Sequence, residues 1–579
     1  MSDESTDADA YSPYTLQQAD DARHAFWADT VADRVEESDP DDPIVVKGGI
    51  SPSGVPHLGN VNEIMRGYYV AEVLRERGHE VRQVFTADDR DPLRKLPRTL
   101  CDLEGTLVDL GEVDAGALGR NLGVPYTDVP DPFGCCDSYG DHFSTIIQDS
   151  ADAVDVPIEL ISTTDLYESG DLEAVTRYVL EHRDRAREVL SQYQEKVDVD
   201  GDYVPFNPIC EECGKITETV TGVDLKASES HGDPDSRTES DAARETGDAS
   251  TVDYRCTDIE AGDRTIEGCG HEGTATLREG KLPWRFEWPA QWQVLGVDFE
   301  PFGKDHAEGS WPSGQDVARN VLEIDPPVPM VYEWFTLEGE PFSSSAGNVI
   351  LVSDVLELLE PEVLRYFFAK DPAKARDFSI ERLDQLVDEF DRLEAIYFDE
   401  IEGDEDERAF AERVYPLLVE EPREERVRLP YTFAAVLGMF DDPDLREGVA
   451  RKEGHVPDDA PEWAVEAALE RVERARSWAR RTGNEFDYEL ERTTIPDHEF
   501  DAATDEALDE LADFVEAGHG PDEIQGEIYE TAKRHDVDVG EFFAAGYRLF
   551  FDEEQGPKLG PFLAKLDREF VVDRLRRER

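Results

Sequence analysis

The sequence has few cysteines and no long apolar run. Seven cysteines in 579 residues are too few for a disulfide scaffold. No apolar stretch approaches the ~20 residues that a bilayer-spanning helix needs. Residues 1–9 are acidic and polar, which excludes a secretory signal. Because 39% of the residues are hydrophobic, wholesale disorder is also excluded. We expect a soluble, cytoplasmic protein of two or three domains that contacts no membrane.

Basic residues, and lysines above all, are also scarce. The chain has 58 Lys and Arg against 135 Asp and Glu, a net charge of −77, and only 13 of the basic residues are lysines. One interpretation is an enzyme of small substrates that avoids acidic partners. The other is a protein from a cell with molar internal salt, where charges are screened within ~3 Å and acidity maintains solubility. The uniform spread of acidic residues favours the second, so the charge does not exclude a nucleic-acid partner.

The N-terminal part has the pattern of a strand, a loop, a helix and a second strand. An apolar run at 44–46 ends in a Gly-rich loop at 48–54, a helical pattern extends to Gly78, and a second apolar run covers 81–86. This order predicts a βαβ unit with its loop at the carboxyl end of the first strand, where doubly wound sheets bind ligands.

Changes of pattern divide the chain. Residues 1–100 and 282–370 indicate the two halves of an α/β domain, and the irregular segment 101–281, which holds most of the cysteines, indicates an insertion. Within it, the Ser-, Asp- and Gly-rich residues 227–250 predict a disordered loop. Apolar residues at helical spacing dominate residues 371–579 and predict an all-α domain.

Two short motifs suit a nucleotide. His57-Leu-Gly-Asn60 lies where the first strand meets a helix, so backbone N–H groups could hold a phosphate there, and Gly59 allows close approach. Residues 341–350 read P-F-S-S-S-A-G-N-V-I, in which three hydroxyls before a glycine suit a pyrophosphate. Alone, the first could equally be a loop histidine, and the second is better explained as a polar surface turn. Together they resemble the H-I-G-H and K-M-S-K-S signatures of class I aminoacyl-tRNA synthetases.

Further segments make the resemblance closer. Residues 26–29, 48–60, 88–95, 302–306, 343–349 and 560–563 are similar to those of the class I lysyl-tRNA synthetase family, of the halophilic archaeal type. The resemblance implies a Rossmann-type catalytic domain with a zinc-containing insertion, followed by a helical cage that binds the anticodon. It also implies an enzyme that activates L-lysine with ATP and Mg²⁺ and transfers it to tRNA(Lys). The sequence does not give the oligomeric state, and we expect a monomer.

The resemblance also implies site residues. The catalytic residues would be His57, Asn60, Ser343, Ser344 and Ser345. ATP would be bound by these five together with Pro52, Ser53, Gly54, Leu58, Gly59, Ala346 and Gly347. Lysine would be bound by Gly49, Ser51, Asp88, Trp284, His306 and Tyr332. Either Trp284 or Trp288 could cover the lysine stem, and we favour Trp284.

Two departures from the class I signatures stand out. Asn60 stands where the first signature has its last histidine, as is common in the family that the chain resembles. Both lysines of the second are missing, and Pro341 and Ala346 take their places. Lys47, Lys304, Arg94 or Mg²⁺ could supply the lost positive charge.

Cysteines in the insertion indicate a structural zinc. Cys210 and Cys213 form a C-x-x-C knuckle, and Cys256 and Cys269 follow beyond the Ser-rich segment. Four thiolates suit tetrahedral Zn²⁺. Unrelated buried cysteines are the alternative. His271 could replace one thiolate, although the resemblance favours Cys269.

A second cluster lies earlier in the insertion. Asp131, Cys135, Cys136 and His142 fall within twelve residues and could form another zinc site, with Cys136 in a position where the family can have histidine. A buried cysteine pair near a capping aspartate explains the pattern equally well.

Two rival functions remain open on the sequence alone. The missing loop lysines would allow a tRNA-binding or regulatory relative without activation activity. A class I synthetase for another amino acid, such as glutamate or cysteine, is the other rival. The segments at 88–91 and 305–306 offer carboxylates and histidine, whereas a glutamate enzyme needs a cation for the substrate side chain.

Overall fold

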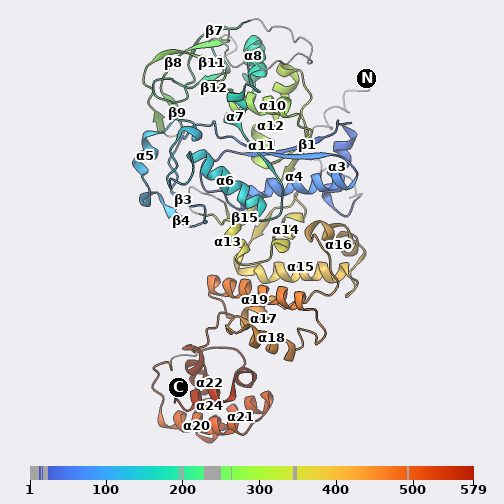
Figure 1. Cartoon of the computed structure of the whole chain (residues 1–579), viewed down its shortest axis with the longest axis vertical. Coiled ribbons are helices and arrows are strands. Elements are labelled where there is room, and N and C mark those ends of the chain that lie inside the picture. Colours follow the sequence, from blue (N-terminus) through green and yellow to red (C-terminus); the bar gives the residue numbers. More distant parts are fainter. Residues whose placement is uncertain are drawn as a thin grey trace. The chain divides into compact units, whose positions relative to one another are not determined.

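The computed structural model describes residues 12–14, 16, 24–194, 197, 201–226, 250–262, 264–342, 348–491 and 495–578. The chain forms two compact units (Figure 1). Unit 1 comprises Met1–Val355, Leu364–Ser379 and Glu402–Glu420, and unit 2 comprises Leu356–Val363, Ile380–Ile401 and Glu421–Arg579. The predicted disordered loop, apart from Ser250, and residues 343–347 of the Ser-rich loop lie outside the described residues.

Unit 1 is built on a five-stranded parallel sheet. Its strands are β1 (Ile44–Ile50), β2 (Val81–Ala87), β5 (Glu159–Ser162), β13 (Phe299–Gly303) and β14 (Val328–Tyr332). They lie in the order β14-β13-β1-β2-β5, so the chain winds outward in both directions from β1. Ile44, Val45 and Val46 are all buried, as expected of a parallel strand covered on both faces.

Helices cover both faces of this sheet. On one face lies α4 (Leu58–Glu76), where Gly67 approaches so closely that an added Cβ would lie 3.2 Å from Val46. On the other face, Val45 belongs to a cluster with Trp288 of α10 (Trp284–Leu295) and Trp311 of α12 (Trp311–Val317). The predicted strand, loop, helix and strand at 44–87 are confirmed, and the fold is a doubly wound α/β sheet.

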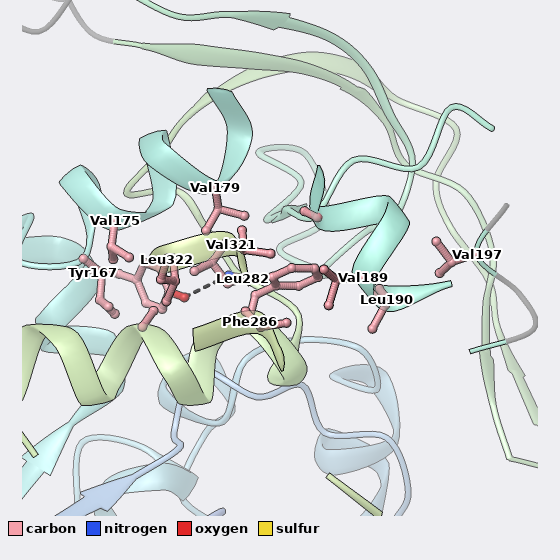
Figure 2. Close-up of a cluster of buried hydrophobic side chains, with 14 of the residues drawn as sticks. Tyr167, Val175, Val179, Val189, Leu190, Val197, Leu282, Phe286, Val321 and Leu322 are labelled. Carbon is pink, nitrogen blue, oxygen red and sulfur yellow. Dashed lines mark hydrogen bonds between the residues drawn. The ribbon is translucent and has the colours of Figure 1, made fainter. Parts of the chain in front are cut away.

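Helix α10 is held by a second apolar core (Figure 2). In this core, Phe286 meets side chains from α7 (Thr163–Ser169), α8 (Glu173–Glu181) and α9 (Arg183–Leu190). The backbone N–H of Leu282 donates to the Tyr167 hydroxyl at 2.8 Å, the dashed line in Figure 2. The helical part of the insertion thus fixes where α10 begins, and with it the position of Trp284.

The rest of unit 1 consists of short elements. Its other helices are α3 (Trp27–Glu37), α5 (Ala115–Arg120), α6 (Tyr139–Asp152), α11 (Lys304–Gly309) and α16 (Glu405–Leu418), with α13 (Val352–Leu356) and α14 (Pro361–Ala369) at unit boundaries. Its short strands are β3 (Thr99–Cys101), β4 (Leu107–Asp109), β6 (Asn207–Pro208), β7 (Val220–Asp224), β8 (Thr251–Arg255), β9 (Ile259–Ala261), β10 (Arg264–Ile266), β11 (Glu272–Thr276), β12 (Gly280–Lys281), β15 (Phe335–Leu337), β16 (Glu340–Pro341) and β17 (Arg376–Phe378).

The described part of unit 2 is helical. Its helices are α15 (Leu383–Tyr397), α17 (Tyr431–Leu437), α18 (Pro443–Lys452), α19 (Glu462–Thr482), α20 (Ala502–Glu516), α21 (Pro521–Arg534), α22 (Val539–Phe551), α23 (Leu559–Leu563) and α24 (Arg568–Leu575). The predicted helical spacing is confirmed in α15, where Leu383, Val387 and Phe390 are all buried. Among the described helices of both units, none is long and apolar enough to cross a membrane.

Candidate active site

The carboxyl ends of four strands meet at one edge of the sheet. Gly49 of β1 is in register with Thr86 of β2, and Gly303 of β13 is in register with Tyr332 of β14. The residues that follow these ends therefore share one edge, which is where doubly wound sheets bind their ligands. The predicted substrate residues lie there: Gly49, Ser51, Asp88, His306 and Tyr332.

His57 is the N-cap of α4, and Asn60 completes a capping box. The Nδ1 of His57 accepts from the Gly59 N–H at 3.1 Å, and the Oδ1 of Asn60 accepts from the His57 N–H at 2.9 Å. Since Nδ1 is the acceptor, the proton of the neutral ring lies on Nε2. Burial lowers the pKa of His57 to about 4, so at neutral pH the ring is an uncharged N–H donor at a helix N-terminus.

The two signature motifs lie together. The Phe342 ring stacks on His57, with centroids 5.0 Å apart, and the N–H of Leu58 donates to the Ile350 carbonyl at 2.9 Å. The side chain of Asn348 donates to the Pro341 carbonyl at 2.9 Å. Both stems of the Ser-rich loop are therefore fixed at the N-terminus of α4, although 284 positions separate His57 from Pro341 in the sequence.

Two stacked tryptophans of α10, Trp284 and Trp288, form an aromatic surface beside this edge, which we call the Trp284 wall. The rings of Trp284 and Trp288 stack at 5.4 Å, and His306 lies 6.2 Å from Trp284. Trp288 is 2% exposed, whereas Trp284 is only partly buried. Trp284 is thus the indole that a ligand can reach, and Trp288 supports it from behind.

The family follows from the sequence once this geometry is known. Residues 25–231 and 235–420 match the model of a family described as tRNA synthetases class I (K). The chain belongs to this family. The lysine–tRNA ligase of Haloarcula marismortui is 67% identical to it, covering 98% of this chain and 99% of that protein. The lysine–tRNA ligase of Halobacterium salinarum is 68% identical, covering 96% of this chain and 98% of that protein. The lysine–tRNA ligase of Pyrococcus horikoshii is 32% identical, covering 95% of this chain and 99% of that protein.

Glu63 of this synthetase lies at the site between two predicted ligand residues, although the sequence motifs did not indicate it. It lies on α4, and its Oε1 accepts from the Gly49 N–H at 2.8 Å while its Oε2 accepts from the Tyr332 hydroxyl at 2.8 Å. Burial raises the pKa of Glu63 to about 7. A signal was available, because Asn62, Glu63 and Arg66 are polar residues inside a helix that is otherwise largely apolar and buried.

Lys47 is buried and already paired with a carboxylate. It is 1% exposed, and its Nζ donates to Glu300 at 2.7 Å. The same carboxylate accepts from the indole N–H groups of Trp288 at 3.0 Å and Trp292 at 2.5 Å. The charge of Lys47 is therefore already compensated inside the protein, which favours Arg94, whose side chain is exposed, over Lys47 as the substitute for a loop lysine.

A second buried network supports the β2 side of the edge. Lys281 contacts Asp91 and lies 2.9 Å from Glu287. Tyr167 donates to Glu287 at 2.7 Å. This network ties the segment after β2 to α7 and α10, because its members come from all three.

Asp88 lies beside this network. It is 5% exposed and accepts from the Gln291 side chain at 3.1 Å. Burial, followed by the charge of Asp91, raises the pKa of Asp88 well above its ordinary value. The predicted substrate residue Asp88 is therefore a carboxylate that would be stabilised by a cation.

The predicted zinc ligands of the insertion lie together. Cys210, Cys213, Cys256 and Cys269 place their sulfurs within 4.8 Å of one another. The Cys210–Cys269 and Cys213–Cys256 sulfurs are 3.6 and 3.7 Å apart. Zinc with Zn–S distances of about 2.3 Å places tetrahedral sulfurs about 3.8 Å apart, so the cluster fits that ion. His271 instead contacts Glu211 at 2.9 Å.

The second predicted cluster also has zinc-like geometry. Asp131, Cys135, Cys136 and His142 place one ligand atom each within 4.8 Å of the others. The Nε2 of His142 lies 2.9 Å from the Cys101 carbonyl, which assigns the proton to Nε2 and leaves Nδ1 as a free lone pair. That Nδ1 is 3.4 Å from both Cys135 Sγ and Asp131 Oδ1, so the nitrogen faces the other ligands.

Proposed function

We propose that this protein is a lysine–tRNA ligase, which forms lysyl-adenylate from L-lysine and ATP and transfers the lysyl group to tRNA(Lys). The observation that carries the proposal is the convergence of His57, both stems of the Ser-rich loop and the Trp284 wall at one sheet edge. The names of the full-length relatives support the same amino acid.

In the first step, the lysine carboxylate attacks the α-phosphorus of ATP and pyrophosphate leaves. The protein positions the reactants and stabilises charge, and it needs no general base because the carboxylate is already ionised. The Nε2–H of His57 and the N-terminal N–H groups of α4 would donate to phosphate oxygens. Asn60 would hold His57 in place, because its carbonyl binds the backbone of that residue.

The remaining ATP contacts are proposed from the motif. They comprise Pro52, Ser53, Gly54, Leu58 and Gly59, and the loop residues Ser343, Ser344, Ser345, Ala346 and Gly347. Mg²⁺ would bind the phosphates and supply positive charge. Arg94 is exposed and remains a candidate for the charge of the missing lysines, whereas Lys304 is engaged by Glu333 at 2.9 Å.

We further propose two zinc ions with structural roles. The four-cysteine cluster would hold one, and Asp131, Cys135, Cys136 and His142 the other. All four positions of each ion would be taken by protein ligands, which is typical of structural sites. The helical cage of residues 371–579 would bind the anticodon, and the zinc-bearing insertion of residues 101–281 would interrupt the catalytic domain.

Pyrophosphate exchange tests the amino acid. With ATP and labelled pyrophosphate, we expect exchange with lysine and at least a hundredfold less with glutamate, arginine or cysteine. Asp88 and Glu63 lie at the ligand edge with no cation within ion-pair distance among the described residues, so a cationic side chain is favoured. The planar guanidinium of arginine does not replace the compact ammonium of lysine. Faster exchange with glutamate or cysteine would refute lysine as the substrate, and no exchange with any amino acid would favour a binding protein without activation activity.

Salt should affect tRNA binding in an unusual direction. In ordinary complexes, added salt weakens binding through counterion release. Because this chain carries a net charge of −77, we expect KCl first to increase tRNA affinity, by about tenfold or more up to molar concentration, as the repulsion is screened. A filter-binding titration checks this, and a monotonic loss of affinity would contradict it.

A further inference from the structure

Three carboxylates near the ligand edge already have a lysine. Lys47 lies 2.7 Å from Glu300, and Lys281 contacts Asp91 and lies 2.9 Å from Glu287. These pairs are internal to the protein, so the charge of each of these carboxylates is already compensated. Each is also supported by hydrogen bonds from Tyr167 or the α10 indoles.

Glu63 differs from these carboxylates. Its two oxygens accept from the Gly49 N–H and the Tyr332 hydroxyl, both neutral donors. Among the described residues, no cation lies within ion-pair distance of it. Its side chain is only partly buried at the ligand edge, and each oxygen of a carboxylate can accept a further hydrogen bond.

The surroundings of Glu63 leave its charge uncompensated. The charged and titratable groups that act on it are Tyr332 of β14, Glu300 of β13 and Lys47 of β1, and Lys47 is engaged by Glu300. The charges of Asp305 and Arg66 act on the hydroxyl of Tyr332, where Asp305 raises its pKa and Arg66 lowers it. A partly desolvated carboxylate with neutral donors only is stabilised by a cation that arrives with the ligand.

We propose that Glu63 is the counter-ion for one ammonium group of the substrate, held ready by Gly49 and Tyr332. The proposal rests on the proposed function, since lysine brings two ammonium groups to the site. Asp88, Asp89 and Asp305 also have no cation within ion-pair distance among the described residues, but Asp88 and Asp89 are 5% and 3% exposed and Asp305 is open to water. Glu63 is therefore a partly buried carboxylate at this edge that a substrate cation can compensate, and it takes either the α- or the ε-ammonium.

The first test is Glu63→Gln, which keeps the shape and removes the charge. The Gln amide can still accept from Gly49, and the Tyr332 hydroxyl can rotate to accept from its NH₂ group, so the fold is retained. We expect the KM for lysine in pyrophosphate exchange to rise at least tenfold, with less than a twofold change for ATP. Glu72→Gln is the matched control, because Glu72 lies on the same helix and its one ion pair among the described residues is with Arg75, at 2.6 Å.

Proton release provides a readout that a structural role would not change. The pKa of Glu63 is about 7, and a bound ammonium lowers the pKa of a carboxylate. At pH 7, lysine binding should therefore release up to about half a proton from this group. Calorimetry in two buffers of different ionisation enthalpy measures it, and Glu63→Gln should lose this release while Glu72→Gln keeps it.

Two inhibitors identify the ammonium group. L-Norleucine keeps only the α-ammonium, and 6-aminohexanoate keeps only the ε-ammonium. Glu63→Gln should weaken inhibition by one of them and not the other. An unchanged lysine KM, or an equal rise for lysine and ATP, would overturn the proposal while leaving the function intact. Absence of lysine-dependent exchange in the wild-type protein would instead overturn the function, and this inference with it.

Discussion

Replacing His57 by alanine should reduce kcat for lysine-dependent pyrophosphate exchange by about 10²–10³-fold, the usual cost of removing one positioned donor from a developing charge. The Nε2–H of His57 is that donor, since Nδ1 is occupied by the Gly59 N–H. Stopped-flow or exchange kinetics at saturating lysine and ATP measure the effect. Because burial lowers the pKa of His57 to about 4, its ring stays neutral above about pH 5, and exchange should show no step near pH 6.5 from this residue.

A second substitution separates capping from catalysis. His57→Asn supplies a good N-cap oxygen but has no donor at the Nε2 position. We expect it to recover most of the ~1 kcal/mol of stability that a lost N-cap costs, and little of the activity. Full recovery of kcat in His57→Asn would show that His57 acts only through the helix end.

Removing zinc from the four-cysteine cluster should unfold the strands around it. Cys256→Ser removes one thiolate from a site whose apparent binding free energy in small zinc domains is about 10–16 kcal/mol. We expect loss of one zinc per chain by native mass spectrometry, protease sensitivity near residues 206–281, and at least a tenfold loss of exchange activity. The activity falls because β12 of this region carries Lys281, which contacts Asp91 at the ligand edge.

The control for this experiment is Cys101→Ala. Cys101 is buried in an apolar core and belongs to neither cluster, so this variant should keep both metals. Cys136→Ala should lose only the second zinc. If chelator-free wild-type protein contains no zinc and all seven thiols react, both zinc assignments are wrong.

The sequence predicts best those features that are local. The βαβ unit and the position of His57 follow from apolar runs and a Gly-rich loop within about 45 consecutive residues, because strand and helix periods are visible over such a distance. The cysteine knuckle is equally local, since the spacing of Cys210 and Cys213 alone identifies it.

Partners that are distant in the sequence could not be predicted. Glu63 bonds Tyr332 across 269 positions, and Gln291 bonds Asp88 across 203. No periodicity encodes such a pair, because each side chain is placed by a different strand or helix packing on the sheet. The pairing of Lys47 with Glu300 is equally distant, across 253 positions, and only the fold brings the two side chains together.

The Lys47–Glu300 pair has a consequence for a protein in concentrated salt. Its side chains are 1% and 4% exposed, whereas those of Arg82 and Glu159, another pair in the same sheet, are 43% and 53% exposed. Mobile ions attenuate exposed charges within ~3 Å at molar strength but do not enter the interior. The Lys47–Glu300 ion pair is therefore hardly screened by salt. Changes in ionic strength will weaken the exposed ion pairs at the protein surface, while the position of β1 below Gly49 stays constant.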